Sequence, residues 1–144
     1  MILVSPSQSA LGKMAPLWKN PQYLLVQVTS RCNAKCAFCF NPDVRKPPVR
    51  ELTPEQAGKI AANLGHLFHL AVSGGEPFLR DDLTEWIDSF CRNAGVRSVT
   101  IATNGSRPDR VAETLETLSV RNRQTIFSLV LSVDAYEHRH DMIR

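Results

Sequence analysis

The sequence lacks features that would place it in several large classes of protein. No run approaches the roughly 18 consecutive apolar residues of a membrane-spanning helix, so we expect no membrane span. The start, MILVSPSQSALGKM, has no basic stretch before its short apolar run, as a signal peptide would have. Repeats and low-complexity tracts are also missing. We therefore expect a cytoplasmic protein.

Charge gives little indication of a partner. The 144 residues include 17 Lys and Arg against 14 Asp and Glu, which leaves a net charge of +3. The basic residues are scattered and not interleaved with aromatic ones, so nothing local supports nucleic-acid binding. An apolar share of 43% and a charged share of 22% are ordinary for a globular protein. The length suits one domain.

Four short apolar runs predict strands. Their later members approach continuous hydrophobicity, as strands buried on both faces do. The runs cover residues 23–29, 67–73, 98–103 and 126–133. The last three begin about 30 residues apart, which is typical of repeated βαβ units. Residues 1–20 are polar and irregular, and we interpret them as a lead-in to a domain over residues 21–144.

Helical signals fill the gaps between these runs. Thr53, Pro54 and Gln56 form a capping-box pattern with proline at the first helical position. Gly95 is placed to end the second helix. The predicted helices cover residues 52–67, 80–95 and 107–119. The alternation of strand and helix predicts an α/β fold with a parallel sheet.

Every distinctive polar motif follows a predicted strand. SGGEP covers residues 73–77, TNGS covers 103–106 and LSVD covers 131–134, while three cysteines follow the first strand. Each short motif taken alone is more often a turn or a helix cap. The carboxyl ends of parallel strands lie together, however, and functional sites collect there. The sequence therefore predicts one site at this edge of the sheet.

The three cysteines have the spacing C-x3-C-x2-C, at Cys32, Cys36 and Cys39. Clustered cysteines in a cytosolic protein indicate metal or redox chemistry before disulfides. Cys91 differs, because it lies in a predicted helix beside Phe90, and we expect it to be a small core residue.

The choice of metal depends on a fourth ligand. A structural zinc site needs four nitrogen or sulfur ligands. Neither the pair His66 and His69 nor the pair His138 and His140 has a spacing that completes such a site. Three thiolates suit a 4Fe–4S cluster whose fourth iron stays open for a substrate or cofactor.

Together these motifs resemble those of the radical S-adenosylmethionine (radical SAM) enzymes. The cysteine motif has an aromatic residue, Phe38, directly before its last cysteine, and GGEP follows the second strand. TNG and LSVD are similar to the branch that contains molybdenum-cofactor biosynthesis protein A and the SPASM-domain peptide-modifying enzymes. The closing EHRHDMIR resembles that branch's fourth helix, so the resemblance covers about residues 22–144.

The resemblance implies a ligand set. The three cysteines would hold three irons of a 4Fe–4S cluster, and the amino and carboxylate groups of SAM would chelate the fourth. Gly74, Gly75 and Glu76 would receive the methionine ammonium. The other implied SAM contacts are Phe38 at the adenine and Thr103 and Ser132 at the methionine carboxylate or ribose, with Asn104 and Asp134 close to those positions.

The resemblance also implies an activity. An electron from a donor such as a flavodoxin or ferredoxin would reach SAM through the cluster and break its C5′–S bond. The resulting 5′-deoxyadenosyl radical would abstract hydrogen from a substrate, either a small molecule or a peptide, that the sequence does not identify. No side chain is assigned to that hydrogen transfer.

The expected fold is a partial (β/α) barrel of the radical SAM type. The family's core has six βα units, whereas this sequence supplies about the first four. We therefore expect a fragment, a truncated reading frame or one piece of a split protein, with the fourth strand as a bare edge. Two alternatives stay open, namely a cluster-binding protein without turnover and a zinc-binding module.

Overall fold

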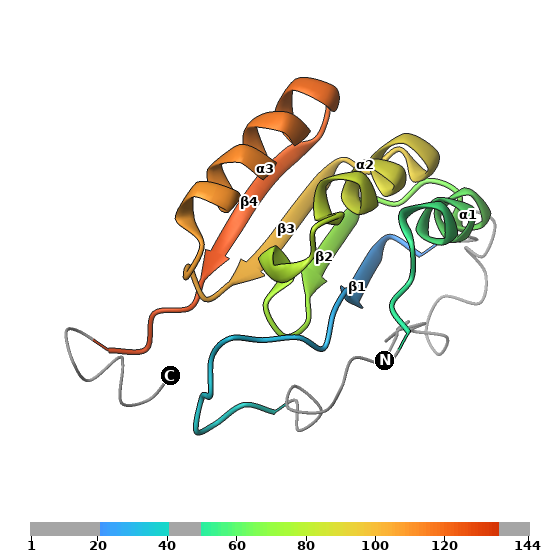
Figure 1. The fold of residues 1–144 in the computed structure, drawn as a ribbon. Coiled ribbons are helices and arrows are strands. Elements are labelled where there is room, and N and C mark those ends of the chain that lie inside the picture. The colour runs from blue at the N-terminus through green and yellow to red at the C-terminus, as the bar shows by residue number, and fades with distance from the viewer. Residues whose placement is uncertain (1–20, 41–49, 136–144) are drawn as a thin grey trace, which may run out of the picture.

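The computed structural model describes residues 21–40 and 50–135, and its four strands form one parallel sheet in the order β1-β2-β3-β4 (Figure 1). The strands are β1 (Tyr23–Gln27), β2 (His69–Ser73), β3 (Ser98–Thr103) and β4 (Ile126–Leu131). The helices are α1 (Pro54–Leu64), α2 (Leu83–Ala94) and α3 (Pro108–Arg121), with a short 3-10 helix, η2 (Pro77–Leu79). The predicted α/β order is confirmed. The lead-in, the EHRHDMIR segment and the pair His138 and His140 lie outside the described residues.

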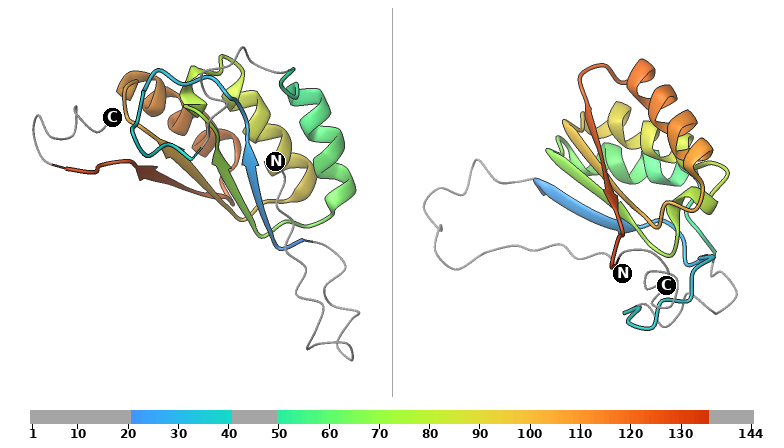
Figure 2. Two further views of the ribbon diagram at one scale, coloured as in Figure 1. Left: turned by 90° about the horizontal axis from the view of Figure 1, so that it is seen from below. Right: turned by 90° about the vertical axis from the view of Figure 1, so that its left-hand side faces the viewer.

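The three helices cover one face of the sheet (Figure 2). Leu70 pairs with Leu24 on one side and with Val99 on the other, and Val99 pairs in turn with Phe127. All pairings are parallel, so the four carboxyl ends lie along one edge. The predicted motifs that follow the strands are therefore brought to the same side of the molecule.

The core lies between the sheet and these helices. Helix α2 supplies Trp86, Ile87 and Phe90, which are almost fully buried, and the rings of Trp86 and Phe90 stack at 4.8 Å between centroids. Burial of one such side chain contributes about 1.5–3 kcal/mol. Cys91 belongs to the same core, as predicted. The strands contribute Leu24, Val26, Leu70, Val72, Val99 and Ile101, and Val28 joins them just after β1.

The predicted helix ends are confirmed at two positions. The Thr53 side chain accepts a hydrogen bond from the Gln56 backbone N–H at 3.2 Å, and the Gln56 side chain accepts one from the Thr53 N–H at 3.1 Å. This capping box satisfies backbone donors that the first turn leaves without partners. Gly95 follows α2 with a φ of 58°, a left-handed conformation that glycine adopts without strain.

Strand β4 forms the open edge that the sequence predicts. Within the described residues it pairs only with β3, and Ile126, Val130 and Leu131 are 68%, 53% and 56% exposed. The expectation that the later strands are buried on both faces holds for the middle of β2, where Leu70, Ala71 and Val72 are all buried, but it is wrong for β4. Among the helices of the described segments, none is both long and apolar enough to cross a membrane.

Candidate functional site

The cysteine loop leaves the carboxyl end of β1 and lies beside the turn that follows β2. Cys32 and Cys36 are partly buried and Cys39 is exposed, and the Cys39 N–H donates to the Cys36 carbonyl at 3.2 Å. All three residues carry thiols. The loop therefore presents three sulfur ligands at the edge where the strand ends meet.

The Gly-Gly turn after β2 packs directly on the base of this loop. Gly75 N–H donates to the Thr29 carbonyl at 2.8 Å, and Glu76 N–H donates to the Arg31 carbonyl at 2.7 Å. A Cβ on Gly74 would lie 2.4 Å from the Thr29 oxygen, and one on Gly75 would lie 2.1 Å from the Arg31 oxygen. Glycine is therefore required here because two backbone segments approach too closely for a side chain.

Glu76 connects the ends of β2 and β3. Its side chain, in a residue only 1% exposed, accepts hydrogen bonds from Phe78 N–H at 3.1 Å, Thr103 Oγ1 at 2.9 Å and Asn104 N–H at 2.7 Å. The first of these bonds caps the N-terminus of η2. Three donors compensate for much of the cost of burying a carboxylate. Glu76 thus holds three segments in a fixed relation at the edge of the site.

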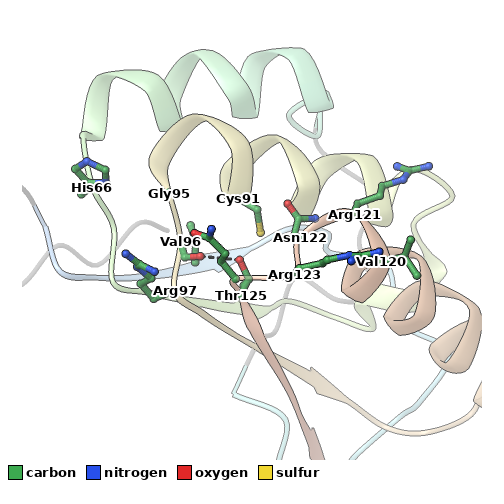
Figure 3. Close-up of a pocket in the computed structure, with 11 residues that line it drawn as sticks. His66, Cys91, Gly95, Val96, Arg97, Val120, Arg121, Asn122, Arg123 and Thr125 are labelled. Atoms are coloured by element: carbon green, nitrogen blue, oxygen red, sulfur yellow. Dashed lines mark hydrogen bonds between the residues drawn. The ribbon is translucent and has the colours of Figure 1, made fainter.

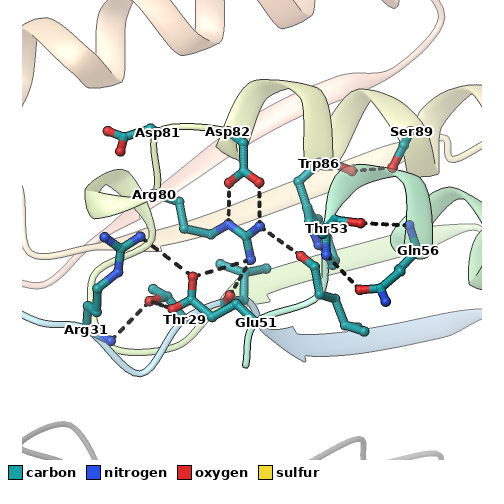
Figure 4. A network of polar contacts seen from close by, with 12 residues as sticks. Thr29, Arg31, Glu51, Thr53, Gln56, Arg80, Asp81, Asp82, Trp86 and Ser89 are labelled. Carbon is teal, nitrogen blue, oxygen red and sulfur yellow. Dashed lines mark hydrogen bonds and ion pairs between the residues drawn. The ribbon is translucent and has the colours of Figure 1, made fainter. Parts of the chain in front are cut away.

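Arg80 joins the two ends of the segment that runs from Val28 to Leu52 and carries the cysteines, which we call the excursion (Figure 4). Its guanidinium donates to the Val28 carbonyl at 2.7 Å and to the Leu52 carbonyl at 2.9 Å, on either side of the excursion. It also forms a two-point contact with Asp82, at 2.7 and 2.8 Å. A buried guanidinium is tolerated because nearly all of its donors have partners.

A second tie joins the same two segments. Thr29 Oγ1 donates to a Glu51 carboxylate oxygen, and the Arg31 guanidinium lies 3.6 Å from the other oxygen of Glu51. The Arg31 N–H in turn donates to Thr29 Oγ1 at 3.0 Å. The start of the excursion, just before Cys32, is therefore bound to its end at Glu51.

The top of the cysteine loop is fixed by a different contact. Asn33 Nδ2 donates to Ser106 Oγ at 2.8 Å, and Asn104 Nδ2 donates to Asn33 Oδ1 at 2.9 Å. The loop after β1 is thereby joined to the loop after β3.

The electrostatic environment affects two groups near the loop. Burial raises the pKa of the Cys32 thiol, the Ala34 N–H bond to its sulfur opposes this, and the negative charge of Glu76 raises the pKa further. The hydrogen bond from Arg80 lowers the pKa of Asp82, against the effect of partial burial. A metal centre on Cys32 must therefore displace a firmly held proton.

The arrangement of the thiols bears on the kind of metal centre. In the described residues, no three His, Cys, Asp or Glu side chains are gathered closely enough to hold one metal ion. An iron–sulfur cluster places each thiolate on a different iron, so its ligands stand further apart than those of one ion. The donor chemistry of the loop suits such a cluster.

The structure brings most of the predicted site residues together. Cys32, Gly74, Gly75, Glu76 and Thr103 are linked by the contacts above. Ser132 lies just past β4, and its N–H donates to the Thr103 carbonyl at 3.0 Å. The Thr103 hydroxyl donates its hydrogen bond to Glu76. Phe38 is 56% exposed and Asp134 is also exposed. Contacts of these residues with SAM stay predictions.

Sequence reasoning missed four residues that shape the site, namely Thr29, Asn33, Glu51 and Arg80. Arg80 and Asp82 follow the GGEP motif directly, but both were assigned to the start of the next helix. The other three carry no local signal, because their partners lie far along the chain. Only the folded backbone shows which polar side chains meet.

A pocket of about 550 Å³ lies at the opposite end of the strands (Figure 3). Its wall includes Cys91, Arg97 and Thr125, and Thr125 Oγ1 donates to the Val96 carbonyl at 2.8 Å. Burial raises the pKa of Cys91 to about 11, so this thiol is not a reactive one at neutral pH. The predicted motifs all lie away from this pocket.

Comparisons with known proteins identify the family. The family model described as the Radical SAM superfamily matches residues 26–144. GTP 3′,8-cyclase of Paracoccus denitrificans is 35% identical over 112 residues, which are 74% of this chain and 32% of that protein. The GTP 3′,8-cyclase of Aquifex aeolicus is 39% identical over 57% of this chain and 27% of its own length. These relatives confirm the resemblance to the molybdenum-cofactor branch.

A solved structure supports the fold. The crystal structure of BtrN in complex with AdoMet and 2-DOIA matches 75% of this chain and 56% of that one, with a TM-score of 0.54 and 15% identity. The chain spans about a third of the length of the curated relatives it matches, from 27% to 38%. The match of the family model over most of the sequence, on the motifs described above, shows that the chain belongs to the radical SAM superfamily.

Proposed function

We propose that this chain binds a 4Fe–4S cluster through Cys32, Cys36 and Cys39 and takes part in the reductive cleavage of SAM to a 5′-deoxyadenosyl radical. The observation that carries the proposal is the position of the three thiols. They lie on one loop whose base packs on the Gly-Gly turn at the carboxyl edge of a parallel sheet. When bound, the cluster would supply one electron to the sulfonium of SAM, and the amino and carboxylate groups of the methionine part would chelate its open iron.

The residues of the turn would receive the methionine ammonium. Backbone carbonyls suit a cation, and the absence of side chains on Gly74 and Gly75 lets the turn pack against the backbone of the cysteine loop, beside the proposed cluster ligands. Glu76 adds a negative charge below the turn, while its three donors hold the carboxylate in place. Its main contribution is therefore orientation of the turn and an electrostatic preference for a cation.

The remaining SAM contacts would come from the neighbouring strand ends. Thr103 and Ser132, at the ends of β3 and β4, are joined by a backbone hydrogen bond, and their hydroxyls would bind the methionine carboxylate or ribose. Phe38 is exposed on the cysteine loop and offers an apolar surface to the adenine.

The activity requires two partners. A flavodoxin or ferredoxin would deliver the electron, and the radical would abstract hydrogen from a small-molecule or peptide substrate. Residues 21–144 would form the part of the core domain that binds cluster and SAM. We place the reaction in the cytoplasm, because a reducing compartment keeps thiols available for a cluster.

Anaerobic reconstitution tests the proposal. We expect iron and sulfide in nearly equal amounts, an EPR signal on reduction, and formation of 5′-deoxyadenosine from SAM. Cys32→Ala, Cys36→Ala and Cys39→Ala should each abolish the cluster, whereas the matched control Cys91→Ala should keep it. Colour without SAM cleavage would favour a cluster-binding protein without turnover. A cluster that survives loss of Cys36 but not of Cys91 would overturn the ligand assignment.

A further inference from the structure

Asn33 uses both ends of its side-chain amide. It lies one residue after Cys32, on an exposed part of the loop, and it contacts Ser106 through Nδ2 and Asn104 through Oδ1. A side chain that donates and accepts at once has a defined orientation, because a rotation that keeps one bond breaks the other.

The loop that receives Asn33 has its own internal bonds. The Ser106 N–H donates to Asn104 Oδ1 at 2.9 Å, so Asn104, like Asn33, uses both ends of its amide. Gly105 has a φ of 74° and its N–H donates to Thr103 Oγ1 at 3.1 Å. Asn33 is therefore bound to an ordered turn.

These contacts complete a closed circuit of bonds, here called the ring, and Cys32 is one of its members. Asn104 N–H donates to Glu76 Oε2 at 2.7 Å, and Glu76 N–H donates to the Arg31 carbonyl at 2.7 Å. The peptide chain from Arg31 to Asn33 completes the circuit. Cys32 lies within the ring, whereas Cys36 and Cys39 lie beyond it along the loop.

We propose that Asn33 is a positioning residue that fixes Cys32 relative to the Gly-Gly turn and to the loop after β3. This rests on the proposed function, because the ring holds together one cluster ligand and the residues assigned to SAM. Asn33 contacts neither group. It acts through Asn104 and Ser106, so that the first thiol is placed before any metal binds.

The first test measures amide hydrogen exchange in the metal-free full chain. A hydrogen bond of this kind changes an equilibrium about two- to tenfold. Asn33→Ala should therefore accelerate exchange by about that factor in residues 103–107 as well as in residues 31–36, with the amides of α2 unchanged. Lys35→Ala, an exposed change in the same loop, should leave residues 103–107 as they are. Acceleration confined to the substituted loop would overturn the proposal.

A double-mutant cycle provides the second test. Ser106→Ala removes the same contact from the other side and leaves the cysteine loop intact. The double variant with Asn33→Ala should exchange no faster than the single Asn33 variant, because Asn33→Ala already breaks the hydrogen bond that Ser106→Ala removes. If the exchange rate of the double variant rose by the product of the two single effects, the two residues would act independently and the proposal would be overturned.

A third measurement connects the ring to the metal site. After reconstitution, iron loss to a chelator should be about two- to tenfold faster in Asn33→Ala and in Ser106→Ala than in the unmodified chain or in Lys35→Ala. Equal rates in all four would contradict a role at the cluster. If the unmodified chain binds no iron, the proposed function fails, while the exchange data still decide whether the ring exists.

Discussion

Cys91 and Cys32 lie at opposite ends of the same sheet, and they differ in how each is held. Cys91 is packed among apolar side chains of the core beside the amino ends of β3 and β4. Cys32 is held by hydrogen bonds of its neighbours at the carboxyl edge. Apolar packing depends on how well a volume is filled and has no preferred direction, whereas hydrogen bonds need defined angles and distances. The carboxyl edge is therefore the end where single polar changes alter geometry.

The largest expected effect is at the base of the cysteine excursion. Arg80→Met should lower the free energy of unfolding by about 3–5 kcal/mol, because it leaves the Val28 and Leu52 carbonyls without their donor and Asp82 without its partner. Chemical denaturation of the metal-free chain measures this.

The matched control for Arg80 is Lys59→Met, which breaks an exposed ion pair with Glu55 and should change stability little. If the two variants unfolded alike, the tie at the base would not stabilise the carboxyl edge. The contrast between the two ends of the sheet would then lose its main support.

A smaller effect is expected at the Gly-Gly turn. Gly75→Ala places a Cβ against the Arg31 backbone and should cost about 1–3 kcal/mol, with faster amide exchange at residues 29–33. Because the strain falls on the cysteine loop, the change should reduce cluster retention as well as SAM binding. The two functions cannot be separated at this position.

Gly58→Ala in α1 is the comparison for Gly75. Its Cβ would lie 3.2 Å from the end of the Asn93 side chain and 3.6 Å from Ser89 Cβ, with no backbone atom as close, and alanine is the better helix former by about 1 kcal/mol. We expect equal or higher stability there. Equal losses at both glycines would mean that the close approach to Arg31 has no special consequence.

The smallest effect concerns Cys91 and appears only at high pH. Burial raises the pKa of its thiol from an ordinary 9.0 to about 11. Above pH 9 the unfolded chain releases this proton while the folded chain keeps it, so the free energy of unfolding should fall as the pH rises toward 11. The loss is about 2–3 kcal/mol for a two-unit difference.

Cys91→Ala removes that titration. The difference in unfolding free energy between the unmodified chain and this variant should therefore shrink by the same amount between pH 8 and pH 11, as followed by denaturation at each pH. Parallel curves would show that folding does not raise the pKa of Cys91.

Local sequence patterns predicted the elements and their ends well. The capping box of Thr53, the left-handed Gly95 and the core position of Cys91 all depend on neighbours within a few residues. The placement of the motifs at one edge also followed, because parallel strands leave no other arrangement.

The contacts that hold the site were beyond such patterns. Asp82 is a residue type that often caps helices, and it lies at the N-cap of α2. Its side chain makes no capping hydrogen bond, because its carboxylate accepts hydrogen bonds from Arg80 instead. Glu76 was expected to face a ligand, yet it already has three protein donors. In both cases a residue has two possible partners, and the choice depends on distances that the fold sets.

The ties at the base have a consequence for chain length. Thr29 with Glu51, and Arg80 with the carbonyls of Val28 and Leu52, bring the two ends of the excursion together. For a loop whose ends are already joined, doubling its length costs only about 0.6 kcal/mol in entropy. The position of Cys32 relative to β2 is therefore set by these ties at the base, and it does not depend on the number of residues that separate the cysteines from Glu51.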